Sequence, residues 1–214
     1  AVRMTLDRAT SDLAASASRL REKQLDAETA RREQSALRAL QSLADALAPP
    51  PDQPPKEQTA QQPPEGQEQN AQPEEAVPPV AQLKLLRDLQ SDVGDRTRSA
   101  EARAPKTPPS DDDAKLREAE LHQLAADQQS VHEATSRLLE RVPIPDPMKD
   151  SLPATRDETE PRETALSAME QSAEKLRAAE TGKPTQAAQQ TAVSSLDKLL
   201  KQWQQRAAQQ QSLA

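Results

Sequence analysis

The chain contains no Phe, no Tyr and one Trp among 214 residues, and this shortage restricts its fold more than any other feature. Sandwich and α/β cores rely on aromatic and β-branched side chains packed on pleated surfaces. Leu, Ile and Val together supply only 32 residues. Ala, the best helix former, supplies much of the remaining apolar content. We therefore expect an all-α protein with a thin core.

Nineteen Pro residues cluster between long Pro-free segments, and Pro interrupts helices. Six of these segments show helical periodicity and pair into three helical hairpins, coiled-coil-like or in a loose bundle, joined by proline-rich linkers. The predicted organisation is a hairpin over 1–48, an acidic proline-rich linker over 49–79, a central hairpin over 80–142, a second proline-rich linker over 143–160 and a hairpin over 161–211.

Leu residues at regular spacing define the predicted seam of the first hairpin. Leu6, Leu13 and Leu20 recur every seven residues, which indicates a heptad-like stripe. In the third hairpin, Gly182 and Pro184 predict the turn, because Gly often follows one helix and Pro often begins the next.

The central hairpin is predicted to be interrupted at Gly94. Its second arm begins at Ser110, a predicted helix cap, and the three Asp residues that follow lie near the positive end of the helix dipole. The apolar stripe of this arm alternates by three and four residues through Leu121, Leu124, Gln128, Val131, Thr135, Leu138 and Val142. Gln128 and Thr135 are polar positions that we expect to tune the register at a cost in stability.

A shift of 156 residues aligns segment 7–47 with segment 163–203 without a gap, and 11 of the 41 positions are identical. This alignment predicts an internal duplication; its alternative is chance similarity between two Ala- and Gln-rich segments. The seven Leu of segment 7–47 are too few to offset the entropy of ordering that segment alone. We therefore expect the hairpins to pack together or against another chain. Apolar positions also match in kind: Leu13 with Met169, Leu37 with Val193, and Leu47 with Trp203.

Several classes of function lack the residues that they need. The chain has no Cys, so it has no disulfide, thiolate nucleophile or zinc-thiolate cluster. Its net charge of −7 argues against binding nucleic acid, which needs a basic surface. No apolar run approaches the roughly 18 residues of a membrane span. We expect no integral membrane segment and no nucleic-acid partner.

The candidates for chemistry have simpler interpretations. His122 and His132 are ten residues apart, which places them on different faces of one helix, so they do not form a metal-binding pair. Asp111 to Asp113 are better explained by helix capping than by cation binding. Trp203 is predicted to pack in a core or interface rather than to stack on a ligand. We expect a protein that is not an enzyme and holds no metal or cofactor.

The segment Val80-Ala81-Gln82-Leu83-Lys84-Leu85-Leu86, followed by Arg96-Thr97 and preceded by a Pro/Gln/Glu-rich tract, resembles uncharacterised planctomycete cell-envelope coiled-coil proteins. The run Gly182-Lys183-Pro184-Thr185 is similar to their hairpin turn. The resemblance implies an exported or envelope-associated bacterial protein, in the periplasm or the cell envelope, and a cytoplasmic location stays open. It transfers no functional residues. The first residue is Ala, which fits a mature secreted form or an excised segment.

These observations favour a non-catalytic structural or protein-interaction module that binds a helical partner or self-associates. The alternative is a chaperone-like or regulatory protein that binds a client peptide or small ligand in a helical groove, and an anchoring role at a membrane or cell-wall surface is a third hypothesis. The predicted interaction face consists of Leu37, Leu40, Leu43, Leu47, Leu196, Leu199 and Trp203.

Overall fold

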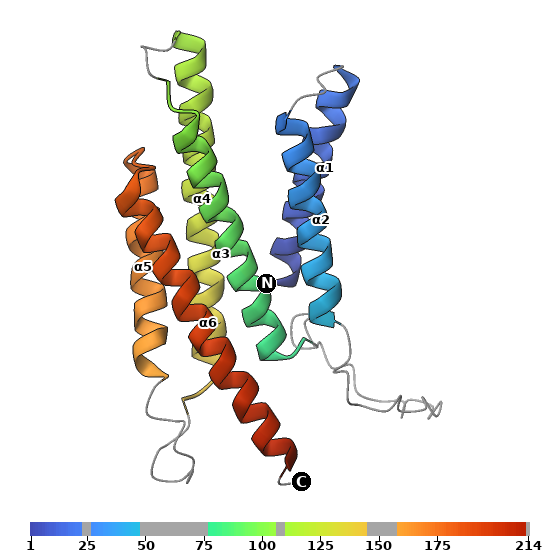
Figure 1. Ribbon diagram of the computed structural model, residues 1–214, viewed down its shortest axis with the longest axis vertical. Helices are drawn as coiled ribbons and strands as arrows, with labels where there is room; N and C mark the ends of the chain where they lie inside the picture. The colour runs from blue at the N-terminus through green and yellow to red at the C-terminus, as the bar shows by residue number, and fades with distance from the viewer. Residues whose placement is uncertain (23–26, 48–76, 106–109, 145–157, 213–214) are drawn as a thin grey trace, which may run out of the picture.

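A computed structural model describes residues 1–22, 27–47, 77–105, 110–144 and 158–212. These residues form helices and no strand, so the prediction of an all-α protein is confirmed. The predicted linkers over 49–79 and 143–160 lie mostly outside the described residues. The helices, in chain order (Figure 1), are α1 (Val2–Arg21), α2 (Ala27–Leu47), α3 (Pro79–Ala102), α4 (Asp111–Arg141), α5 (Thr159–Arg177) and α6 (Lys183–Ser212).

The helix α4 begins as its sequence predicts. The Ser110 hydroxyl accepts a hydrogen bond from the backbone N–H of Asp113 at 3.2 Å and donates one to the Asp113 carboxylate at 2.6 Å. Three Asp residues occupy the first turn, where they interact favourably with the helix dipole. The predicted cap at Ser110 is confirmed.

The predictions made from Gly94 and Gly182 have different outcomes: the interruption at Gly94 is wrong, and the turn at Gly182 is confirmed. Helix α3 continues through Gly94 without interruption, because Gly costs only about 1 kcal/mol in a helix interior and tertiary packing outweighs that. Gly94 is buried beside α6, where a Cβ atom would lie 3.9 Å from Cβ of Gln189. The turn predicted at Gly182 and Pro184 lies between the end of α5 at Arg177 and the start of α6 at Lys183. Within it, Ala179 adopts the left-handed conformation, with φ of 60°.

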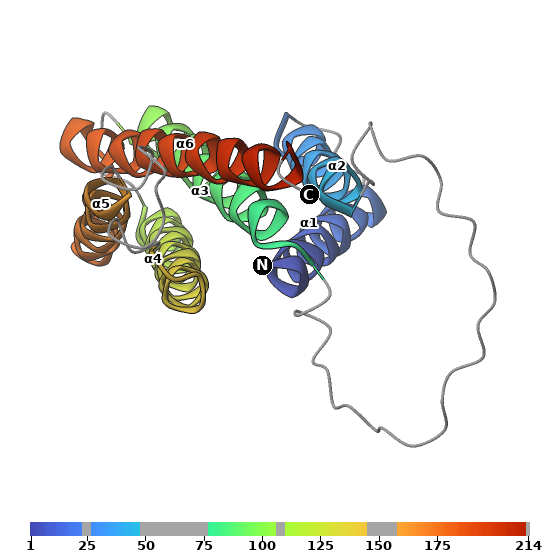
Figure 2. The same ribbon diagram turned by 90° about the horizontal axis from the view of Figure 1, so that it is seen from below.

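Helices α3, α4, α5 and α6 form a four-helix bundle around one core. The helix α3 packs against α4 and α6, and α5 packs against the same two helices, so the four make a closed ring. Figure 2 shows this ring in end view, with α1 and α2 beside α3. The segments predicted as the central and C-terminal hairpins therefore share one core.

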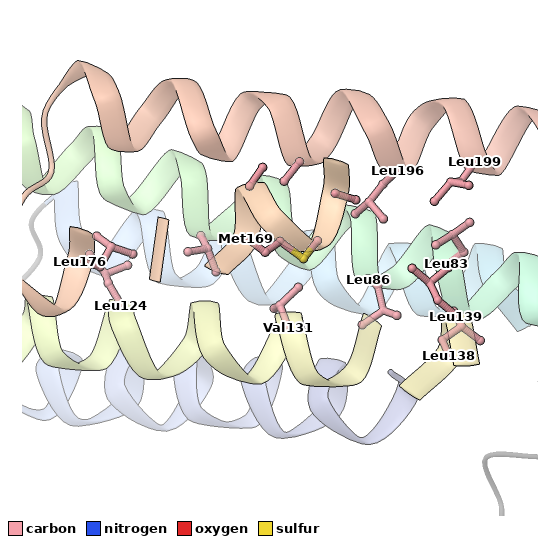
Figure 3. Close-up of a cluster of buried hydrophobic side chains, with 14 of the residues drawn as sticks. Leu83, Leu86, Leu124, Val131, Leu138, Leu139, Met169, Leu176, Leu196 and Leu199 are labelled. Carbon is pink, nitrogen blue, oxygen red and sulfur yellow. The ribbon is translucent and has the colours of Figure 1, made fainter. Parts of the chain in front are cut away.

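The core of the bundle contains most of the large apolar side chains of these four helices. The predicted stripe of α4 is buried from Leu121 to Leu138. Met169 and Leu176 of α5 point toward Val131 and Leu124 of α4 (Figure 3). The indole of Trp203 is also part of this cluster, in agreement with the prediction that it packs in a core or interface.

A layer of hydrogen-bonded side chains crosses the middle of this core. Gln90 of α3 and Gln128 of α4 exchange two amide hydrogen bonds of 3.0 and 2.7 Å, and both residues are fully buried. Gln189 of α6 donates to the hydroxyl of Thr97 at 2.9 Å. Buried amides are costly unless they are paired, so this layer favours one register of the helices over shifted ones.

A buried arginine joins three helices at one end of the bundle. Arg162 of α5 donates to the carbonyls of Leu139 and Val142 at 2.9 and 2.8 Å, at the C-terminal end of α4, where a cation is favoured by the helix dipole. Its guanidinium lies 5.7 Å from the ring centre of Trp203 in α6, within cation–π range. Glu158 pairs with both Arg162 and Arg206.

The polar layer predicts a non-additive pair of mutations. Replacing Gln128 by Leu leaves the buried amide of Gln90 unpaired, and we expect it to lower the free energy of unfolding by about 1–3 kcal/mol. The double variant Gln90→Leu/Gln128→Leu removes both polar groups and is expected to recover most of this loss. Urea unfolding of the single and double variants measures the difference. A double variant as unstable as the sum of the two single variants would contradict this explanation.

Candidate interaction surface

The first hairpin buries a different stripe from the one that its Leu spacing predicts. The buried residues of α1 are Thr5, Ala9, Asp12 and Ser16, which recur at intervals of three and four. On α2, Thr29 and Ala36 are buried. Small side chains at these positions allow α1 and α2, which pack on each other, to approach closely.

Five large apolar side chains of this hairpin are instead exposed. Each of five Leu side chains keeps between 41% and 56% of its surface accessible, and the predicted seam through Leu6, Leu13 and Leu20 is therefore wrong. We call these five residues the Leu face: Leu6, Leu13 and Leu20 of α1, with Leu37 and Leu40 of α2.

The Leu face lies on the side of the hairpin that points away from the bundle. At about 100° per residue, the Leu row of α1 lies on one side of its buried stripe, and Arg8 lies on the other. On α2, Leu37 and Leu40 likewise lie opposite Ser35 and Arg38. Since Arg8, Ser35 and Arg38 all contact carboxylates of α3, both Leu rows face outward.

The inward side of the hairpin docks on the bundle through charged groups. The Arg8 guanidinium donates to Asp127 of α4 at 3.1 Å and lies 3.9 Å from the carboxylate of Asp92 in α3. It also lies 3.2 Å from Asp12 one turn away in α1. Arg96 of α3 makes a second ion pair with Asp127. These groups connect three helices across the junction.

Shorter polar contacts and one small apolar cluster complete the junction. The hydroxyl of Ser35 in α2 donates to Asp92 at 3.2 Å. Burial raises the pKa of the Asp92 carboxyl, and the positive charges of Arg8 and Arg96 oppose this shift. Leu43 packs against Leu85 of α3. The junction is thus mainly polar, in contrast to the core of the bundle.

The predicted interaction face is divided among three environments. Leu37 and Leu40 are exposed on the Leu face, whereas Leu43 is buried against α3. The side chain of Leu47 lies outside the part of the chain that the structure describes. Three further residues of the predicted face lie in the bundle core, where α6 packs against α3 and α5, and this corrects the prediction: Leu196, Leu199 and Trp203.

The alignment of segments 7–47 and 163–203 relates the two hairpins residue by residue. Small residues are buried in both: Ala9 and Ala165, Ser16 and Ser172, Thr29 and Thr185, Ala36 and Ala192. The large apolar residues differ: the exposed Leu13, Leu20 and Leu40 correspond to the buried Met169, Leu176 and Leu196. The face that the second hairpin packs against the bundle therefore corresponds to the face that the first hairpin exposes.

The sequence contains a signal for this difference that the seam prediction did not use. Three or four residues after each Leu of α1, where a coiled-coil seam needs a second large apolar residue, the chain has Ala, Ser, Thr, Lys or Gln. A charged pair, Arg8 and Asp12, lies at the spacing of one helical turn. Such a helix has one Leu row and one polar row, and both need a partner.

Two grooves lie along the junction between the first hairpin and the bundle. A groove of about 280 Å³ is lined mainly by α2 and α3, with Thr5 and Arg8 of α1. A groove of about 470 Å³ is lined mainly by α1, α3 and α4, with Ser35 of α2. The larger one contains four Arg side chains, of which Arg8, Arg96 and Arg103 are ion-paired with carboxylates, while Arg19 donates to Thr29. The charges of this groove are therefore balanced within the protein.

The residues that the structure describes hold neither a cluster of metal ligands nor a helix that could span a membrane. Within that part of the chain, no three His, Asp or Glu side chains come together as a metal site, and His122 lies exposed beside Glu118. None of the described helices combines the length and the apolar content that crossing a membrane requires.

Comparison of the chain with family models, with curated proteins and with solved structures finds no match in any of the three.

Arg8 is predicted to hold the first hairpin on the bundle. Replacing Arg8 by Met keeps most of the side-chain volume but leaves Asp12 and Asp92 without their cation, and we expect docking to weaken by about 1–3 kcal/mol. Hydrogen–deuterium exchange should become faster in α1 and α2 and stay unchanged in α5. The matched control is Arg3→Met, because the Arg3–Asp7 pair is exposed and contributes little. Equal effects of the two substitutions would contradict this role.

Asp92 predicts a stability effect that depends on pH. Since burial raises its pKa, the neutral carboxyl favours the folded protein, and this stability is lost as pH rises through that pKa. Asn resembles the neutral form and can still accept from Ser35. We expect Asp92→Asn to be more stable than the parent at neutral pH. This difference in stability should disappear below about pH 3, where the parent carboxyl is also protonated. Thermal unfolding across this pH range tests the sign, and a less stable Asn variant at neutral pH would contradict it.

Proposed function

We propose that this protein is a non-catalytic interaction module that binds helical partners in a coiled-coil manner through the Leu face of α1 and α2. The observation that carries the proposal is the row of five exposed Leu side chains on one side of a two-helix surface. A contiguous exposed apolar surface of this kind usually marks an interaction site. Leu at heptad spacing is the pattern that a partner helix recognises.

The way in which the hairpin docks supports this proposal. Arg8 and Ser35 fix the inward side to Asp92 and Asp127, so the outward side is presented by helices that are already ordered. A preformed surface loses less conformational entropy on binding than a disordered segment does. The six helices thus divide into a bundle that provides a scaffold and a hairpin that provides the binding surface.

The groove hypothesis has less support. The larger groove is polar, and its cations already have partners within the chain. Ligand sites more often combine apolar walls with a few convergent polar groups. We therefore favour the Leu face over either groove as the binding surface.

A place in the periplasm or the cell envelope is part of the proposal. It rests on the resemblance of residues 80–97 to planctomycete envelope proteins, and the chain itself contributes only its helical character. Partners in that compartment would be helical proteins.

The proposal is tested with the full chain and a fluorescent designed helical hairpin that carries Leu at heptad spacing on one exposed face. We expect fluorescence anisotropy to report binding with micromolar affinity, since a small apolar helical interface has a free energy of roughly −8 kcal/mol. The variant Leu13→Glu/Leu37→Glu should bind at least about 10-fold more weakly, because it places charges on the apolar face.

Leu116→Glu is the matched control. Leu116 is 71% exposed and belongs to α4, so its substitution changes an exposed Leu outside the Leu face. Binding should be unchanged in this control. An absence of binding by the parent chain, or an equal loss in the control, would count against the proposed surface.

A further inference from the structure

We infer that the Leu face is covered by the Leu face of a second copy of this chain, so that two first hairpins form an intermolecular four-helix bundle. This inference rests on the proposed function and names the partner. It is drawn from the correspondence between the two hairpins, from the side on which the first hairpin docks, and from its charge.

The second hairpin indicates what kind of structure covers such a face. Met169, Leu176 and Leu196, the equivalents of Leu13, Leu20 and Leu40, pack in the core with side chains of α3 and α4. Figure 3 shows two of these contacts, of Met169 with Val131 and of Leu176 with Leu124. The face is therefore suited to a pair of packed helices, and α1 with α2 is itself such a pair.

The described helices of the same copy are not available to cover the Leu face. Arg8 and Arg38 hold the opposite side of the hairpin against α3, so the Leu face points away from the bundle. The face of α3 and α4 that would suit it is already occupied by α5 and α6. Among the residues that the structure describes, no helix is left to cover the Leu face, and this favours helices from another molecule.

A second copy meets these requirements with one interface. The Leu row of α1 extends over about 21 Å at 1.5 Å per residue, and a two-fold axis through the face would place the Leu rows of both copies against each other. Such an interface uses the same patch on both subunits. The four helices α1 and α2 of each copy would then close a ring like that of α3 to α6.

Charge favours pairing at the hairpins over pairing elsewhere. Residues 1–47 contain eight basic and seven acidic side chains, a net charge of +1, whereas the whole chain has −7. The rest of the chain therefore has a net charge of −8 and is self-repelling, while two hairpins can approach without a net penalty. On the exposed side of α1, Arg3 pairs with Asp7.

The first test is sedimentation equilibrium of the full chain between about 1 and 100 μM, a range that brackets micromolar association. We expect the mass to rise from 23.4 kDa toward twice that value. Leu13→Glu/Leu37→Glu should raise the dissociation constant at least about 100-fold, since each subunit brings two charges into the interface. Leu116→Glu should leave it unchanged. Far-UV circular dichroism checks that each variant stays helical.

The second test locates the interface. The chain has no Cys, so a single introduced Cys can be cross-linked only to a second copy. Leu40→Cys should give a cross-linked dimer with a short bismaleimide, and Leu116→Cys should not. This readout does not depend on a destabilising substitution.

The outcomes separate this inference from the proposed function. A monomer at all concentrations that still binds the designed hairpin would overturn the second copy as partner and keep the interaction surface. A monomer that binds no hairpin would overturn both. A dimer that is unaffected by Leu13→Glu/Leu37→Glu, or that is cross-linked equally through position 116, would show that another surface pairs and would overturn the inference.

Discussion

The limited supply of large apolar side chains shapes this protein. With 32 Leu, Ile and Val residues, the chain can fill one helical core, and that core lies among α3, α4, α5 and α6. A small core stabilises a domain only slightly. Outside this core, the first hairpin docks on the bundle mainly through ion pairs and hydrogen bonds, with one small apolar contact between Leu43 and Leu85.

Polar groups inside the bundle fix an arrangement that Leu and Ala alone would leave open. Apolar seams of Leu and Ala can slide by a heptad at modest cost. The paired amides of Gln90 and Gln128 lose their partners in a shifted register, and Arg162 reaches the end of α4 in only one register. The layer in the middle and the arginine at one end therefore align the four helices along their length.

The first hairpin is attached to the bundle mainly by polar groups, and five of its Leu side chains stay exposed. Ion pairs of Arg8 with Asp92 and Asp127 hold the hairpin on its polar side. Had the hairpin docked through Leu13 and Leu20, as its counterpart does through Met169 and Leu176, no apolar surface would remain. The two hairpins, which align without a gap, thus differ in the face that they pack against the bundle.

The sequence alone determined the all-helical class, the cap at Ser110 and the buried stripe of α4, because these depend on residue type and on spacing within one segment. It also predicted Gln128 and Thr135 as seam residues, both of which are buried. Only the tertiary structure decided that Leu196, Leu199 and Trp203 lie in a core while Leu37 and Leu40 are exposed. Periodicity shows that a helix has an apolar row, but which row finds a partner depends on the helices that pack beside it and on the free energy of the competing polar contacts, and these are properties of the assembled molecule.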